Sequence, residues 1–163
     1  MPSDASSKTL LVVWHSRTGA SEALARSAAR PGDALLIRAS DVTADHLLSA
    51  AGYLFICPEN LGALSGEMKE MFDRTYYPVL GQIEGRPYAT IIAAGSDGEG
   101  AQRQLDRIVK GWRLKRVAEH AIVNIDAQTP EAILAAKQVP QSALDDAGDM
   151  GLALIEGIHA GIF

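Results

Sequence analysis

The residues best suited to binding chemistry form a short polar stretch, residues 16–21, directly after an apolar run. The first N–H groups of a helix lack partners within it, and its dipole favours an anion there. Hydroxyl side chains add donors, an arginine adds charge, and a glycine lets the backbone approach a ligand closely. The stretch precedes a segment of helical composition, and it therefore predicts a phosphate site. The residues of this site are Ser16, Arg17, Thr18, Gly19, Ala20 and Ser21.

The same residue types also occur at strand-to-helix turns that bind nothing. Serine, threonine and glycine are ordinary capping residues, and Arg17 could simply project into solvent. Two further loops, residues 58–66 and 95–100, also follow apolar runs. The repetition favours one ligand site shared by three loops.

Composition limits the classes of protein to consider. The 163 residues, 47% hydrophobic and 21% charged, suit one globular domain. A net charge of -5 argues against nucleic acid or an anionic membrane as the main partner. The single cysteine, Cys57, excludes an internal disulfide and a cysteine-based zinc cage, and His46, His120 and His159 lack metal-ligand spacing.

The sequence predicts one domain over residues 1–163, in which residues 1–7 form a loose polar leader. The leader has no apolar signal core, and no apolar run reaches the ~20 residues of a membrane span. We therefore expect a cytoplasmic protein without a membrane span.

Short apolar runs alternate with segments of helical pattern along the chain. Pro58 is expected to end the third strand, and Tyr77-Pro78 to end a helix over residues 67–76. The expected strands are residues 10–14, 34–37, 53–57, 88–94 and 117–125. The other expected helices follow residues 21, 41 or 43, 100, 129 and 140. This alternation predicts an α/β fold with a parallel sheet covered on both faces, whose ligand lies at the carboxyl ends of the strands.

The three loops resemble those of a known family. Residues 16–21 are similar to the phosphate loop of flavodoxins, S/T-x-T-G-x-S/T. Residues 58–69, with Phe72-Asp73-Arg74, resemble the middle segment of flavodoxin-like NAD(P)H oxidoreductases. These include the NADPH-dependent FMN reductases and the quinone reductases of the tryptophan-repressor-binding-protein type. Residues 85–89 and 95–101 continue the resemblance, which weakens after Leu114.

The resemblance implies a flavodoxin-like, doubly wound, five-stranded parallel sheet of order 2-1-3-4-5. It implies FMN, with its phosphate in the first loop and its ring between the other two. The ring would be flanked by Pro58, Glu59, Asn60, Leu61, Gly62, Ala63, Gly95, Ser96, Asp97 and Gly98. Asn60 could offer an amide and Asp97 could accept from the ring imide, although both residues equally suit plain turn chemistry.

The resemblance further implies an oxidoreductase that passes electrons from NAD(P)H through FMN to a quinone or flavin acceptor. The cofactor carries the chemistry, so no catalytic side chain and no metal ligand is assigned. The alternative is a flavodoxin-type electron carrier that serves a redox protein. Residues 58–66 and 95–100 contain no aromatic side chain, which leaves a flavin face open and favours the enzyme. A homo-oligomer could complete the pocket with Tyr76, Tyr77 or Trp112.

Two other classes share this arrangement of elements. A phosphoacceptor receiver domain needs acidic residues at strand ends, where this chain has Trp14-His15 and Cys57-Pro58. A nicotinamide-binding Rossmann domain needs G-x-G-x-x-G after its first strand. Here the glycines at 95, 98 and 100 follow the fourth strand in a different spacing, although Asp126 lies at a suitable distance for a ribose. His15 is expected to be a packing residue or to line the loop, and Cys57 to be a small buried hydrophobe.

Overall fold

Residues 8–163 are described by a computed structural model, and the expected leader, residues 1–7, lies outside the described residues. The main path of the sheet is β2-β1-β3-β5-β6, and β7 also pairs with β5. The strands are β1 (Leu10–Trp14), β2 (Ala34–Arg38), β3 (Gly52–Asn60), β4 (Ala63–Leu64), β5 (Pro87–Ala94), β6 (Lys115–Arg116) and β7 (Ala121–Asn124). All pairings are parallel except that of β4 with β3. The predicted order of strand positions is confirmed.

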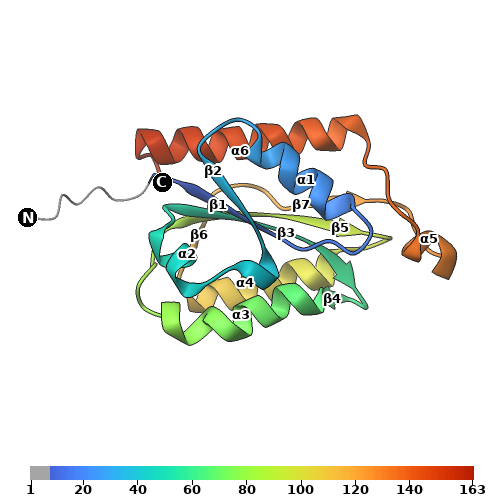
Figure 1. Cartoon of the computed structure of the whole chain (residues 1–163), viewed down its shortest axis with the longest axis horizontal. Helices are drawn as coiled ribbons and strands as arrows, with labels where there is room; N and C mark the ends of the chain where they lie inside the picture. The colour runs from blue at the N-terminus through green and yellow to red at the C-terminus, as the bar shows by residue number, and fades with distance from the viewer. Residues whose placement is uncertain (1–7) are drawn as a thin grey trace, which may run out of the picture.

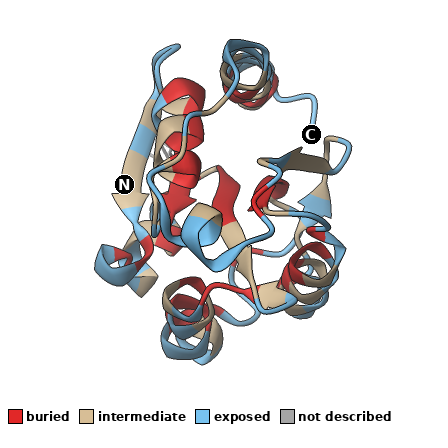
Figure 2. Ribbon diagram, turned by 90° about the vertical axis from the view of Figure 1, so that its right-hand side faces the viewer, coloured by how far each residue is buried: buried red, intermediate tan, exposed pale blue. Residues whose placement is uncertain are grey.

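Helices cover both faces of the sheet, as predicted (Figure 1). The helices are α1 (Ala20–Ala29), α2 (Ala44–Ser49), α3 (Gly66–Val79), α4 (Glu99–Gly111), α5 (Pro130–Leu134) and α6 (Gln141–Ala160), with a 3-10 turn η1 (Ala39–Asp41). Alternate strand residues point to opposite faces. Leu11 and Val13 pack toward α2, α3 and α4, whereas Leu10 and Val12 pack toward α1 and α6. The central strands are therefore buried on both sides (Figure 2).

The predicted number of strands, five, is wrong, because the sheet has seven. Of the expected fifth strand, residues 117–125, only residues 121–124 form a strand, β7, and residues 117–120 form a break between β7 and β6, which lies before the expected range. On either side of this break, Arg116 and His120 both reach the Asp106 carboxylate on α4. The other additional strand, β4, pairs with the end of β3 in a hairpin.

Both prolines expected to end an element lie inside one. β3 continues beyond Pro58 to Asn60. The Ile56 carbonyl accepts from His15 N–H, at the end of β1. Successive residues of a strand direct their backbone groups alternately to the two neighbouring strands, so the Pro58 nitrogen faces the same side as the backbone groups of Ile56. Because β1 has already ended on that side, no hydrogen bond of the sheet is lost. Similarly, α3 continues past Pro78 to Val79, although Pro78 has no N–H to donate to the carbonyl of Arg74.

Candidate cofactor site at the carboxyl ends of the strands

The three loops meet at a cavity of about 350 Å³. They are here called loop 1 (residues 16–21), loop 2 (residues 58–66) and loop 3 (residues 95–100). All three lie at the edge where β1, β3 and β5 end (Figure 1). The volume is within the range of small-molecule sites, roughly 300–1,000 Å³.

Most of the predicted site residues line this cavity. Those that do are Arg17, Thr18, Ala20, Pro58, Glu59, Asn60, Leu61, Gly62, Gly95 and Ser96. Those outside the lining are Ser16, Gly19, Ser21, Ala63, Asp97 and Gly98. Further lining residues, which sequence reasoning missed, are Ala93, Ala94, Ile125, Ala127, Ile133 and Lys137.

Loop 1 presents an uncapped helix N-terminus. Gly19 occupies the N-cap position of α1 with φ 102°, and no side chain caps the helix. A Cβ at Gly19 would meet nothing within 4 Å, so the space above the loop is open. The Ser16 hydroxyl oxygen accepts from Gly19 N–H at 3.0 Å, which leaves the hydroxyl proton for another acceptor. The first amides of α1 are thus available to an anion.

Ser21 adds an unsatisfied donor at the same place. Its side chain is buried in the first turn of α1, and its hydroxyl has no partner within residues 8–163. A buried polar group without a hydrogen bond is costly. An unsatisfied donor in the first turn of α1 fits a loop that binds an acceptor-rich group such as a phosphate.

Loop 2 is a tight hairpin at the cavity mouth. Glu59 and Asn60 of β3 pair with Leu64 and Ala63 of β4, and Leu61-Gly62 forms the turn. Both turn residues have positive φ, as type I′ hairpins require. Leu61 is fully exposed with φ 53°, an unfavourable backbone region for a branched side chain. In this strained conformation, Leu61 is one of the residues that line the cavity.

The Glu59 carboxylate occupies the N-terminus of α4. It accepts from Gly98 N–H at 2.9 Å and from Ala101 N–H at 3.1 Å. Gly98 is the N-cap of α4 and offers no side chain of its own, so Glu59 supplies the missing cap. Of the two helix N-termini that follow loops 1 and 3, α4 already holds an anionic group and α1 does not. The third helix at this edge, α3, carries Glu67 in its first turn, and its first residues do not line the cavity. An anionic ligand is therefore directed to loop 1.

Loop 3 is engaged mainly in packing. A Cβ at Gly95 would overlap the Ala127 carbonyl oxygen, and one at Gly100 would overlap the Gly62 carbonyl oxygen. The exposed Asp97 carboxylate accepts from Glu99 N–H at 3.4 Å. These glycines allow loop 2 and the chain after β7 to approach loop 3 closely, and they close one side of the cavity.

The segment after β7 contributes the basic side chain that the sequence reasoning missed. Lys137 N–H donates to the Thr18 carbonyl at 2.8 Å, so loop 1 and this segment are directly joined. The Lys137 ammonium donates to the Ile133 and Ala135 carbonyls at the end of α5. The sequence indicated a ligand role for Lys137 only weakly, because a lysine after a helix C-terminus is common for structural reasons.

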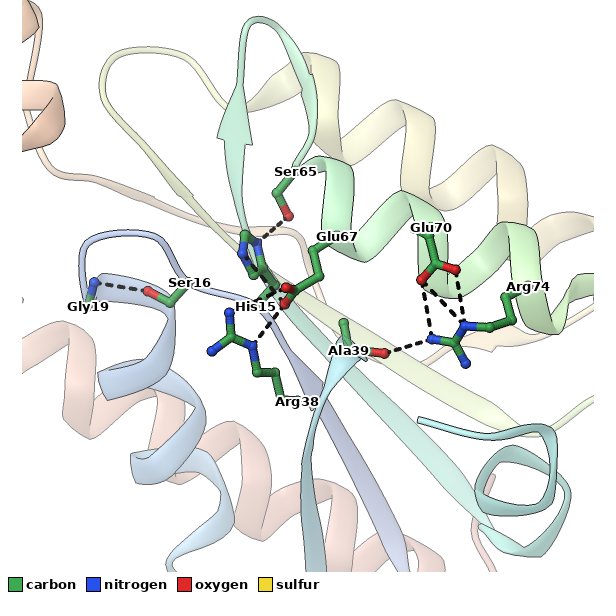
Figure 3. A network of polar contacts seen from close by, with 9 residues as sticks. All are labelled: His15, Ser16, Gly19, Arg38, Ala39, Ser65, Glu67, Glu70 and Arg74. Carbon is green, nitrogen blue, oxygen red and sulfur yellow. Dashed lines mark hydrogen bonds and ion pairs between the residues drawn. The ribbon is translucent and has the colours of Figure 1, made fainter. Parts of the chain in front are cut away.

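His15 links loop 1 to the start of α3. Its Nδ1 lies 2.8 Å from Ser65 Oγ, and its Nε2 lies 3.6 Å from Glu67 Oε2. Arg38 also binds Glu67, at 3.0 Å (Figure 3). The Arg38 guanidinium lies over the Trp14 ring. His15 is 7% exposed and does not line the cavity. This arrangement supports the prediction that His15 is a packing residue.

The buried position of His15 predicts a pH dependence of stability. Desolvation lowers its pKa from the ordinary value of 6.5; Glu67 raises the pKa in part, while Arg38 and Arg17 lower it. Below pH 6.5 the unfolded chain therefore binds a proton more readily, and the free energy of unfolding falls as the pH decreases. Urea titrations at pH 7.5 and 5.5 should show this fall, and His15→Gln should reduce it. An equal fall in the variant would contradict this role of His15.

Two of the other candidate residues, Cys57 and Trp112, are buried in the hydrophobic core. Cys57 is completely buried, and burial raises the pKa of its thiol to about 12, which keeps it protonated. Trp112 is also buried, where it contacts Phe72 and Tyr76, so it cannot serve a neighbouring subunit. Tyr77 remains 78% exposed. Across residues 8–163 no cluster of His, Cys, Asp or Glu could hold a metal ion, and no helix could cross a membrane.

A family model for NADPH-dependent FMN reductase matches residues 41–128, more than half of the chain. The chain belongs to the NADPH-dependent FMN reductase family. The match includes loops 2 and 3 and ends before Lys137, and it begins after loop 1. The family assignment confirms the resemblance found in the sequence.

Solved structures show a similar fold over almost the whole chain of this FMN reductase family member. A WrbA-like flavodoxin from Agrobacterium tumefaciens has a TM-score of 0.76 at 15% identity, covering 93% of this chain and 98% of its own. A flavodoxin from the domain Archaea has a TM-score of 0.74 at 16% identity, covering 93% and 99%. A rubredoxin oxygen oxidoreductase from Desulfovibrio gigas has a TM-score of 0.71 at 13% identity, covering 96% and 37%. A search of curated proteins gives no match. These similarities establish the flavodoxin-like fold.

Proposed function

We propose that the cavity binds FMN, with the phosphate at loop 1 and the flavin ring toward loops 2 and 3. The observation that carries this proposal is the contrast between two helix N-termini. α1 is uncapped and faces open space, whereas Glu59 already caps α4. The unpartnered Ser21 hydroxyl and the Arg17 side chain, which lines the cavity, support the same placement.

The cavity lining favours a reductase over an electron carrier. Bound FMN would supply the ring that accepts a hydride from NAD(P)H and passes electrons to a quinone or flavin acceptor. The protein residues bind and orient: loop 1 would hold the phosphate, and the Asn60 amide, which has no partner within residues 8–163, could reach the ring. No Trp, Tyr or Phe side chain lines the cavity. One face of the ring would therefore stay accessible to a second substrate.

The Glu59 cap also weighs against the Rossmann alternative. A pyrophosphate at loop 3 would need the amides of Gly98 and Ala101, and the Glu59 carboxylate already uses both. Loop 3 is therefore a poor anion site.

The first test is titration of the purified protein with FMN and with riboflavin. We expect quenched flavin fluorescence and tighter binding of FMN, because only FMN carries the phosphate. Consumption of NADH or NADPH is then followed with a quinone or with free FMN as acceptor. Turnover supports the reductase, whereas FMN binding without consumption of NADH or NADPH supports an electron carrier that serves a redox protein. Absence of FMN binding would overturn the proposal.

A further inference from the structure

We propose that Lys137 is a second cation of the phosphate subsite and determines the preference for a phosphorylated flavin. This inference rests on the proposed function and adds to it a residue outside loop 1. Lys137 lies in the segment after α5, beyond the family-model match at residues 41–128.

The position of Lys137 is fixed by two sets of contacts. Its N–H donates to the Thr18 carbonyl at 2.8 Å, so its backbone is attached to loop 1. Its ammonium donates to the carbonyls of Ile133, at 2.8 Å, and Ala135, at 2.5 Å. An ammonium has three donors, so one remains for a ligand. Because Lys137 lines the same cavity as Arg17 and Thr18, that donor lies within a shared site.

The charges around the cavity favour the binding of an anion. Within residues 8–163, neither Lys137 nor Arg17 has an ion-pair partner. Glu59 is the one acidic residue that lines the cavity, and its carboxylate is committed to α4. Cations beside a helix N-terminus are unfavourable, because the dipole there is positive. Arg17 and Lys137 line the same cavity, and a dianionic phosphate bound there would compensate both charges.

A role of Lys137 in structure alone predicts a different result from a role in phosphate binding. If Lys137 served only as the C-terminal cap of α5, its loss would lower stability and weaken FMN and riboflavin equally. A cation that contacts the phosphate affects FMN alone. The dissociation constants of the two flavins, measured side by side, therefore separate the two roles.

The test uses the full chain with Lys137→Gln and Lys137→Arg, measured by quenching of flavin fluorescence. We expect Lys137→Gln to weaken FMN about tenfold, typical of a partly exposed charge-assisted bond, and to leave riboflavin unchanged. Lys137→Arg should retain most of the FMN affinity. The affinity of Lys137→Gln for FMN should also depend less on salt. The matched control is Lys115→Gln, an exposed lysine on β6 at the opposite edge of the sheet, which should bind both flavins normally.

Three outcomes would overturn the inference, and they are distinguishable. Equal weakening of both flavins would assign Lys137 to structure alone. If the FMN affinity is unchanged and the KM rises for NADPH but not for NADH, the Lys137 charge acts on the second substrate instead. If the wild-type protein does not prefer FMN to riboflavin, the phosphate placement itself is wrong and the inference falls with it.

Discussion

Gly19→Asp is expected to raise the dissociation constant of FMN about 100-fold or more. The substitution places a carboxylate at the uncapped N-terminus of α1, where Gly19 has φ 102° and open space above it. Its charge repels a phosphate and competes for the amides that would bind one. Two charges about 5 Å apart interact by about 3 kcal/mol at an effective dielectric constant of 20, and each 1.4 kcal/mol is tenfold in affinity.

The control for this prediction is Gly81→Asp. Gly81 also has positive φ, 80°, and no atom within 4 Å of a Cβ, so the backbone strain and the added charge are similar. It follows α3 at the opposite edge of the sheet, away from the cavity. Fluorescence titration should give the Gly81→Asp variant the wild-type affinity. Unchanged affinity in Gly19→Asp would contradict the placement of the phosphate at loop 1.

The second large effect concerns stability. Gly151→Ala is expected to lower the free energy of unfolding by about 2–3 kcal/mol, as overpacked cores typically do. A Cβ at Gly151 of α6 would overlap the backbone carbonyl of Ala28 in α1, and a backbone atom cannot move aside as a flexible side chain can. Because α1 packs against the sheet beside β1, separation of α1 from α6 would also loosen the core on that face.

Gly148 provides a control three residues earlier in α6. A Cβ there would lie 3.5 Å from the Ser27 carbonyl oxygen, an ordinary contact. Alanine is the better helix former by up to about 1 kcal/mol, so Gly148→Ala should leave the protein equally or more stable. Urea unfolding of both variants without flavin measures the difference. Equal stabilities would show that α1 and α6 do not approach as closely as described.

The parallel α/β sheet was predictable because apolar runs, breakers and helical segments alternate along the chain, whereas the strand order followed from the resemblance to flavodoxins. Each run is nearly continuous, as expected for strands buried on both faces, and the order of elements limits the topologies available. The prolines were less predictable, since their effect depends on neighbours. Pro58 is tolerated because β1 ends before it, whereas α3 includes Pro78 without its N–H as a donor. Likewise, only residues 121–124 of the expected fifth strand form a strand, β7, and Arg116 and His120 before it contact Asp106 of α4.

The sequence by itself determined the fold and the three loops of the candidate site, because residue types and spacing are local and each loop follows its strand directly. Tertiary structure alone decided how the charges are distributed among those loops. Glu59 meets α4 across 39 residues from Gly98, and Lys137 meets Thr18 from the far end of the chain. Such long-range contacts leave no periodic pattern in the sequence. They arise only when the strands pack side by side and bring their carboxyl ends to one edge of the sheet.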